Sequence, residues 1–230
     1  MNRYLLTYSK KGNIRFVSHL DMQRLFKLIL IKAEIDVAYS NGFNPHTRTN
    51  IVQPLSSGFE AEKDYFEFET NAPQNQLELL AKLNANLPQG LFFTGIREIP
   101  VHSKYSTPLT ESSEYLVYVP CKITKEVLAN FASRPEVYIT KRDKKTKTMV
   151  EKNVKPWIYN LDVSPFGEGS LVSMLVRCAA NEAVNPAQLA ESLLSFCGES
   201  YIKEDIRVTR TEIYIIENGT RTKLFEAETL

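Results

Sequence analysis

Two short polar segments, residues 15–21 and 38–46, contain most of the side chains of this chain that could take part in chemistry. The first reads R-F-V-S-H-L-D and includes His19, while the second reads A-Y-S-N-G-F-N-P-H and includes His46. An imidazole titrates near neutral pH, so either histidine could donate or accept a proton. His19 and His46 are therefore the candidate catalytic residues, and their chemistry requires that both converge on one exposed pocket.

The first segment also has simpler explanations. Ser18 and Asp21 have the spacing of a capping box, which predicts that a helix begins at about residue 19. His19 would then lie in the first helical turn, where it could contact a phosphate or simply face the solvent. Asp21 is explained by helix capping alone.

The second segment combines flat and polar side chains around a glycine and a proline. Tyr39 and Phe43 could stack on a planar ligand, while Asn41 and Asn44 could bond to its edges. The alternative is a packed turn whose aromatic rings fill the core. The candidate RNA- or ligand-binding residues of this region are Arg15, Tyr39, Ser40, Asn41, Phe43, Asn44 and Arg48.

A third candidate surface is basic. The net charge of the chain is only +1, which argues against a protein that coats nucleic acid by its overall charge. Residues 141–155 nevertheless carry seven cations and two anions, so they could follow a phosphate backbone. The alternative is a solvated hairpin tip. The candidate phosphate-binding residues here are Lys141, Arg142, Lys144, Lys145 and Lys147.

The elements that must position these residues follow from hydrophobic periodicity. The pattern predicts an α+β protein made of tandem ferredoxin-like domains, each β-α-β-β-α-β, with antiparallel sheets backed by helices. The first domain covers residues 1–100, with strands at 3–8, 14–17, 36–40, 47–53, 65–69 and 91–99 and helices at 19–34 and 74–83. A linker at 101–113 leads to the second domain, 114–230, with strands at 114–119, 137–141, 147–152, 157–163, 171–179 and 206–216 and helices at 124–132 and 186–196.

Composition excludes several classes of protein. Hydrophobic residues make up 43% and charged residues 24%, as in an ordinary globular protein. Three widely separated cysteines form neither a disulfide framework nor a zinc site, and no nucleotide-binding or zinc-protease motif occurs. We therefore expect no metal and no cofactor. The lack of a secretory leader or of a long apolar run predicts a cytoplasmic protein with no membrane contact.

The segments R-F-V-S-H-L-D, A-Y-S-N-G-F-N-P-H and P-L-S-S-G-F-E-A-E-K-D-Y-F-E-F-E together resemble the radical-SAM-linked protein family, a bacterial domain of unknown function. This domain also occurs fused behind radical-SAM modules. The chain has no closely spaced cysteine triplet for an iron–sulfur cluster. The resemblance therefore implies a companion of a separate radical-SAM enzyme, which would itself perform the chemistry.

A more distant resemblance, of architecture only, is to the repeat-associated RNA-processing proteins of CRISPR systems. Three hypotheses follow. The first is an RNA-binding or substrate-presenting accessory module that acts with a radical-SAM enzyme in RNA modification or processing. The second is a metal-independent endoribonuclease that uses His19 and His46. The third is a protein-interaction module that needs no RNA.

Overall fold

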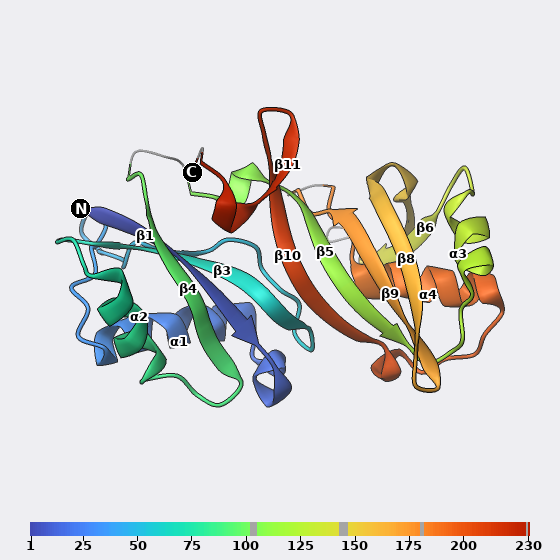
Figure 1. The fold of residues 1–230 in the computed structure, drawn as a ribbon, viewed down its shortest axis with the longest axis horizontal. Coiled ribbons are helices and arrows are strands. Elements are labelled where there is room, and N and C mark those ends of the chain that lie inside the picture. The colour runs from blue at the N-terminus through green and yellow to red at the C-terminus, as the bar shows by residue number, and fades with distance from the viewer. Residues whose placement is uncertain (102–104, 143–146, 180–181, 229) are drawn as a thin grey trace. The chain divides into compact units, whose positions relative to one another are not determined.

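The computed structural model describes the whole chain except residues 102–104, 143–146, 180–181 and 229 and the side chain of Arg142. The fold is α+β, with four α-helices in the described part and sheets in which antiparallel pairing dominates (Figure 1). The chain forms two compact units, which are described separately. Unit 1 consists of Met1–Thr110 and Arg210–Leu230, and unit 2 consists of Glu111–Thr209.

Unit 1 is a sheet with helices on one face. Strand β1 lies between β4 and β3, and both β2 and β10 also pair with β3. Strand β1 pairs with β3 and β4, and β2 pairs with β3, in antiparallel orientation. The elements are β1 (Asn2–Lys10), α1 (His19–Lys32), β2 (Thr49–Ile51), β3 (Glu60–Thr70), α2 (Gln76–Asn84), β4 (Leu91–Ile99), β10 (Arg207–Glu217, nearly all in this unit) and β11 (Thr220–Lys223), with short 3-10 turns at Gly12–Phe16, Thr107–Leu109 and Leu224–Glu226.

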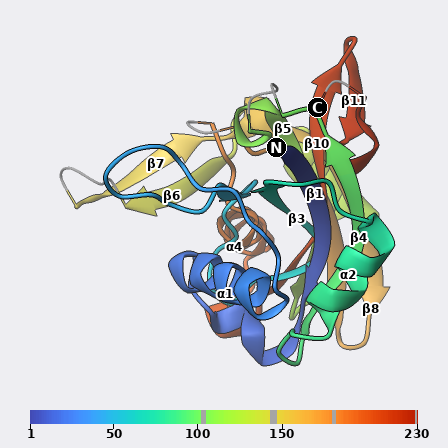
Figure 2. The same ribbon diagram turned by 90° about the vertical axis from the view of Figure 1, so that its left-hand side faces the viewer.

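Helix α1 forms because its sequence supplies both a cap and an apolar face. The Ser18 side chain accepts a hydrogen bond from the Asp21 amide, as predicted for the N-cap. Met22, Phe26, Ile29 and Leu30 are buried against the sheet at helical spacing. Leu79 and Leu83 of α2 belong to the same buried cluster, so both helices cover one face of the sheet; Figure 2 shows them beside the strands of this unit. The helix therefore holds His19 at one end of this layer.

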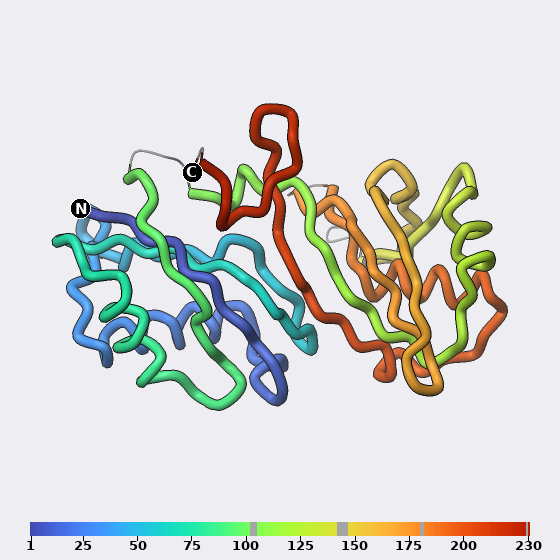
Figure 3. Tube along the Cα trace, in the orientation of Figure 1, coloured from blue at the N-terminus to red at the C-terminus, as the bar shows by residue number. Residues whose placement is uncertain are grey.

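The opposite face of the sheet is covered by the C-terminal segment. Leu224, Ala227 and Leu230 are buried together with Leu5 and Tyr65 of the sheet. The trace in Figure 3 shows the C-terminal part of the chain returning to the strands of the N-terminal part. Strand β1 is thus buried on both faces: residues 3–8 are all buried, and they include the polar Arg3 and Thr7.

Unit 2 contains a three-stranded antiparallel sheet, a separate hairpin and two helices. In the sheet β9 lies between β5 and β8, while β6 and β7 pair only with each other among the described residues. The elements are β5 (Thr110–Val119, nearly all in this unit), α3 (Lys125–Ala132), β6 (Tyr138–Arg142), β7 (Met149–Asn153), β8 (Ile158–Phe166), β9 (Gly169–Arg177) and α4 (Pro186–Cys197), with 3-10 turns at Lys155–Trp157 and Lys203–Asp205.

The structure differs from the sequence prediction in four places. Residues 14–17 belong to a 3-10 turn, not a strand. Residues 36–40 form only isolated bridges, because Val37 pairs with Thr70, the last residue of β3, and Tyr39 pairs with Thr47, which lies outside the strands. The predicted linker overlaps the start of β5 at Thr110. Residues 210–230, predicted in the second domain, lie in unit 1 because β10 pairs with β3.

Among the helices that the structure describes, none is both long enough and apolar enough to cross a lipid bilayer.

Candidate functional site

The second polar segment forms a loop with a closed base, which we call the aromatic loop (Tyr39–His46). The Ser40 amide donates to the His46 carbonyl at 2.8 Å, and the His46 amide donates to the Ser40 hydroxyl at 2.9 Å. Just before this closure the backbone is bonded to β3, since the Ala38 amide donates to the Glu69 carbonyl at 2.8 Å. The base of the aromatic loop is therefore a fixed extension of the sheet.

The tip of the aromatic loop projects into solvent. Phe43 is fully exposed, at 112% of its reference area, and Tyr39 is 51% exposed. Gly42 adopts φ +123°, a conformation that L side chains rarely adopt, which explains the glycine between the two asparagines. Asn41, Asn44 and His46 are exposed as well. The alternative in which the aromatic rings fill the core does not describe this loop.

An arginine–glutamate network supports the aromatic loop from below. The buried Glu69 carboxylate binds Arg3 at 2.7 Å and Arg48 at 3.0 Å. Arg48 also donates to the Tyr39 carbonyl at 3.3 Å, and the Arg3 guanidinium lies 4.7 Å from the ring centre of Tyr105. Burial, followed by the Glu69 charge, raises the pKa of Tyr105. Arg48 therefore joins the loop to the sheet, which leaves only part of its guanidinium for a ligand.

Arg15, another predicted binding residue, lies in the 3-10 turn before α1. Its guanidinium pairs with Glu60 at 3.2 Å and lies 4.8 Å from the ring centre of Phe16. The backbone carbonyl of Arg15 accepts from the Gly58 amide at 2.8 Å. Glu60 begins β3, whereas the aromatic loop is bonded near its last residues, so Arg15 and the loop lie at different ends of this strand.

Beside His19 lies a buried polar cluster, Tyr8, Lys10, Asp64 and Arg210, that the sequence prediction missed. Arg210 donates to Asp64 at 2.6 Å, and each of the four side chains belongs to a residue no more than 2% exposed. Burial and the neighbouring Asp64 charge raise the pKa of Tyr8, and burial lowers the pKa of Lys10. The Lys10 ammonium donates to the Val17 carbonyl at 3.3 Å. The only local sign of this cluster in the sequence was a charged residue, Asp64, at a buried position of β3.

The two candidate catalytic histidines are not brought together. His19 is half-buried and interacts electrostatically with Asp64, while His46 belongs to a loop bonded to the backbone of Glu69. Asp64 and Glu69 are five residues apart on β3, which corresponds to about 17 Å along a strand. His19 is thus related to the middle of β3 and His46 to its last residues, whereas a direct acid–base pair requires both imidazoles at the same substrate bond.

The surroundings of His19 predict a pH dependence of stability. Burial lowers the pKa of His19 below its ordinary value of 6.5; the negative charge of Asp64 acts in the opposite direction, and the like charge of Lys10 lowers the pKa further. The unfolded chain then binds more protons than the folded one, so this contribution is complete above pH 6.5 and is lost as the pH falls through the folded pKa. We expect His19→Gln to reduce the fall in unfolding free energy between about pH 7.5 and pH 5, measured by urea denaturation. An unchanged slope in the variant would contradict this expectation.

The basic segment predicted at residues 141–155 corresponds to the β6–β7 hairpin. Lys141 and Lys147 are exposed at the two sides of its tip. Lys152 lies 4.2 Å from the ring centre of Trp157. Lys144 and Lys145 lie outside the described residues, as does the side chain of Arg142. The described cations of the hairpin thus lie on a projecting pair of strands.

Within the described part of the chain, no group of three or more His, Cys, Asp or Glu side chains could hold a metal ion. The three cysteines are free thiols, of which Cys178 is buried. Burial raises the pKa of Cys121 to about 11, so this thiol is largely protonated at neutral pH.

Comparison with known proteins assigns this chain to a bacterial family. No curated protein matches the chain. Among solved structures, a chain of "Crystal Structure of a Cbf5-Nop10-Gar1 Complex" matches with a TM-score of 0.48 and 10% identity, over 91% of this chain and 48% of that one, so this chain spans about half of its length. "Crystal Structure of an Unknown Protein from Galdieria sulphuraria" matches with a TM-score of 0.27 and 13% identity, over 91% of this chain and 96% of the other. A family model described as "Uncharacterized protein conserved in bacteria (DUF2344)" matches residues 3–186, and the chain belongs to that family.

Proposed function

We propose that this protein is an RNA-binding accessory module that presents RNA to a separate radical-SAM enzyme. The observation that carries the proposal is the full exposure of Phe43 on a loop whose base is fixed. An exposed ring that does not have to be ordered on binding is suited to stacking on an unpaired base. Asn41 and Asn44, which flank the tip, can bond to the edges of that base.

The β6–β7 hairpin supports the same proposal through its charge. Lys141 and Lys147 extend into solvent, where ammonium groups can displace the counterions of a phosphate backbone. Stacking by the aromatic loop would provide affinity for bases, and the lysines would provide affinity that depends on salt. The aromatic loop and the lysines are thus proposed to make separate contributions to RNA binding.

The proposed partner rests on the resemblance of residues 3–70 to the radical-SAM-linked family. In that arrangement the partner enzyme performs the chemistry, and this chain contributes binding and positioning. The alternative endoribonuclease has no comparable support, because His19 and His46 are related to residues of β3 that are five positions apart.

The finer fold assignment, tandem ferredoxin-like domains, belongs to the same proposal. Its support in unit 1 is the element order β1, α1, β2, β3, α2, β4 and the position of β1 between β4 and β3. In unit 2 its support is a helix after β5 and another after β9.

The test is filter binding of labelled total cellular RNA to the purified chain. We expect retention at low salt, and Phe43→Ala should weaken it by about 1–3 kcal/mol, which is roughly 5- to 150-fold. Phe92→Ala is the matched control, since Phe92 is a 55% exposed phenylalanine on β4 of the same unit. The control should bind like the unaltered chain.

A salt series completes the experiment. Replacing Lys141 and Lys147 by glutamate should reduce the slope of log K against log salt by about 1.4, if each lysine contacts one phosphate of a single strand. No retention at low salt, or equal binding by the Phe43 and Phe92 variants, would overturn the proposal. If no RNA is retained but a radical-SAM enzyme co-purifies after nuclease treatment, the chain is a protein-interaction module instead.

A further inference from the structure

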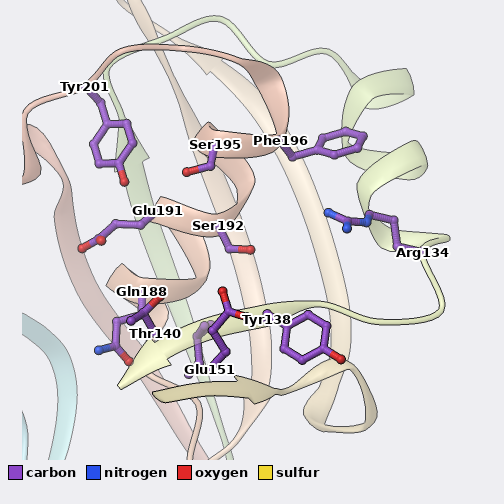
Figure 4. Close-up of a pocket in the computed structure, with 11 residues that line it drawn as sticks. Arg134, Tyr138, Thr140, Glu151, Gln188, Glu191, Ser192, Ser195, Phe196 and Tyr201 are labelled. Atoms are coloured by element: carbon purple, nitrogen blue, oxygen red, sulfur yellow. The ribbon is translucent and has the colours of Figure 1, made fainter. Parts of the chain in front are cut away.

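Unit 2 contains a cavity of about 420 Å³ between helix α4 and the β6–β7 hairpin (Figure 4). One wall is formed by α4 and the other by β6, which packs against this helix. In Figure 4 the strand that carries Tyr138 and Thr140 runs beneath the turns of α4. We call this cavity the α4–β6 groove. Neither the sequence motifs nor the proposed RNA site includes it.

The strand wall of the groove is an open sheet edge. The Val137 carbonyl accepts a hydrogen bond from the Val154 amide at 2.8 Å, so residue 137 faces the β7 side. In an antiparallel pair the backbone groups of successive residues point alternately toward and away from the partner strand. The N–H and C=O groups of Tyr138 and Thr140 therefore point away from β7, and β6 has no second partner strand among the described residues. Such an edge can pair with another extended chain.

The helix wall offers polar side chains that can form hydrogen bonds with the backbone groups of a bound extended chain that do not face β6. Gln188, Ser192 and Ser195 follow one another at positions i, i+4 and i+7, which places them on one face of α4. All three line the groove. Their amide and hydroxyl groups can each donate and accept hydrogen bonds. A peptide backbone lying in the groove would therefore meet polar partners on both sides.

A cation stands at the end of the groove where β6 begins. The Arg134 guanidinium lies 5.5 Å from the ring centre of Phe196, and both residues line the groove. Arg134 is exposed, and it makes no ion pair with a carboxylate within the described part of the chain. An arginine held against a ring presents a planar fork of donors that matches a carboxylate in two hydrogen bonds. This end of the groove therefore favours an anion of carboxylate shape.

The chain direction of β6 decides whether the C-terminal carboxylate of a paired peptide lies beside Arg134. Antiparallel pairing is the more stable arrangement per residue, and it would place the C-terminal end of a peptide beside the first residue of β6. We propose that the α4–β6 groove binds the extended C-terminus of a partner protein, with its free carboxylate on Arg134 and its backbone paired with β6. Glu151, whose Cα is paired with that of Thr140, lines the groove upstream of the carboxylate position and favours a basic side chain there.

The test uses an array of random hexapeptides that are attached through their N-termini and end in free carboxylates. A second array carries the same peptides with amidated C-termini. The labelled full-length chain should bind a subset of the first array, enriched in upstream lysine or arginine, and at least tenfold less of the second. Arg134→Ala should lose at least tenfold of this binding, whereas Arg207→Ala, an exposed arginine outside the groove, should retain it.

The backbone pairing has its own readout. Thr140→Pro removes one outward N–H of β6 and should abolish capture of the selected peptides, with circular dichroism as the check that the variant is folded. Because a misfolded variant would lose binding for another reason, the amide resonances of Tyr138 and Thr140 in the unaltered chain should also shift when a selected peptide is added.

Four results would overturn the proposal: no peptide above background, equal binding to amidated peptides, equal loss in the Arg134 and Arg207 variants, or unshifted resonances of Tyr138 and Thr140. Binding of labelled oligouridylate that requires Arg134, with no peptide captured, would also overturn it and assign the groove to RNA. Phe43→Ala should leave peptide binding unchanged, so that failure of this proposal and failure of the RNA proposal are separable.

Discussion

Replacing Arg210 by methionine is expected to lower the free energy of unfolding by about 3–5 kcal/mol. Arg210 donates to Asp64 at 2.6 Å and to the Gln53 carbonyl at 2.8 Å, and the side chains of the ion pair are 2% and 0% exposed. Without the guanidinium, the Asp64 carboxylate stays in the interior with its main positive neighbour removed. A buried charge that has lost its partner is among the most destabilising changes in a protein.

Urea denaturation measures this effect, and Arg207→Met is the matched control because Arg207 is an exposed arginine of the same strand. The control should change the unfolding free energy by no more than about 0.5 kcal/mol. The double variant Asp64→Leu with Arg210→Met should recover much of the loss, because both charges are then removed together. Equal stabilities of the Arg210 and Arg207 variants would show that the ion pair contributes little to the folded state.

Replacing Glu69 by alanine is expected to have a similar effect and to loosen the aromatic loop as well. The Glu69 carboxylate binds the buried Arg3 and the half-exposed Arg48, and Arg48 holds the Tyr39 carbonyl. We expect a loss of about 3–5 kcal/mol in unfolding free energy, mainly because the buried Arg3 guanidinium loses the carboxylate that it binds at 2.7 Å. Hydrogen exchange of the Ser40 and His46 amides should become faster, since their closure depends on this support.

The control for Glu69 is Glu62→Ala on the same strand. Glu62 pairs with Lys11 at 3.5 Å, and both side chains are about half exposed, so its loss should cost at most about 1 kcal/mol. Unchanged amide exchange at Ser40 and His46 in the Glu69 variant would show that the aromatic loop is held by its backbone closure alone. In that case Arg48 would be free to take part in binding RNA.

Local patterns in the sequence predict the helices well. Helix α1 begins at His19 as predicted and ends at Lys32, two residues before the predicted end. Helix α4 covers Pro186–Cys197 against a prediction of 186–196. Both are set by caps and apolar spacing within a few turns, which are interactions between residues close in sequence. The loop at residues 41–46 was also predicted, because glycine, proline and asparagine restrict the backbone locally, whereas the exposure of its aromatic rings was left open.

What the sequence alone determines here is the α+β class, the positions of the helices and the segments rich in polar and aromatic side chains. Only the tertiary structure decides that β10 joins β3, that Arg210 pairs with Asp64 across 146 residues, and that β6 leaves an edge open beside α4. Strand order and long-range pairing depend on which surfaces meet once the chain is compact. No local periodicity records that choice, since residues of the same type and spacing can pair with several different partners.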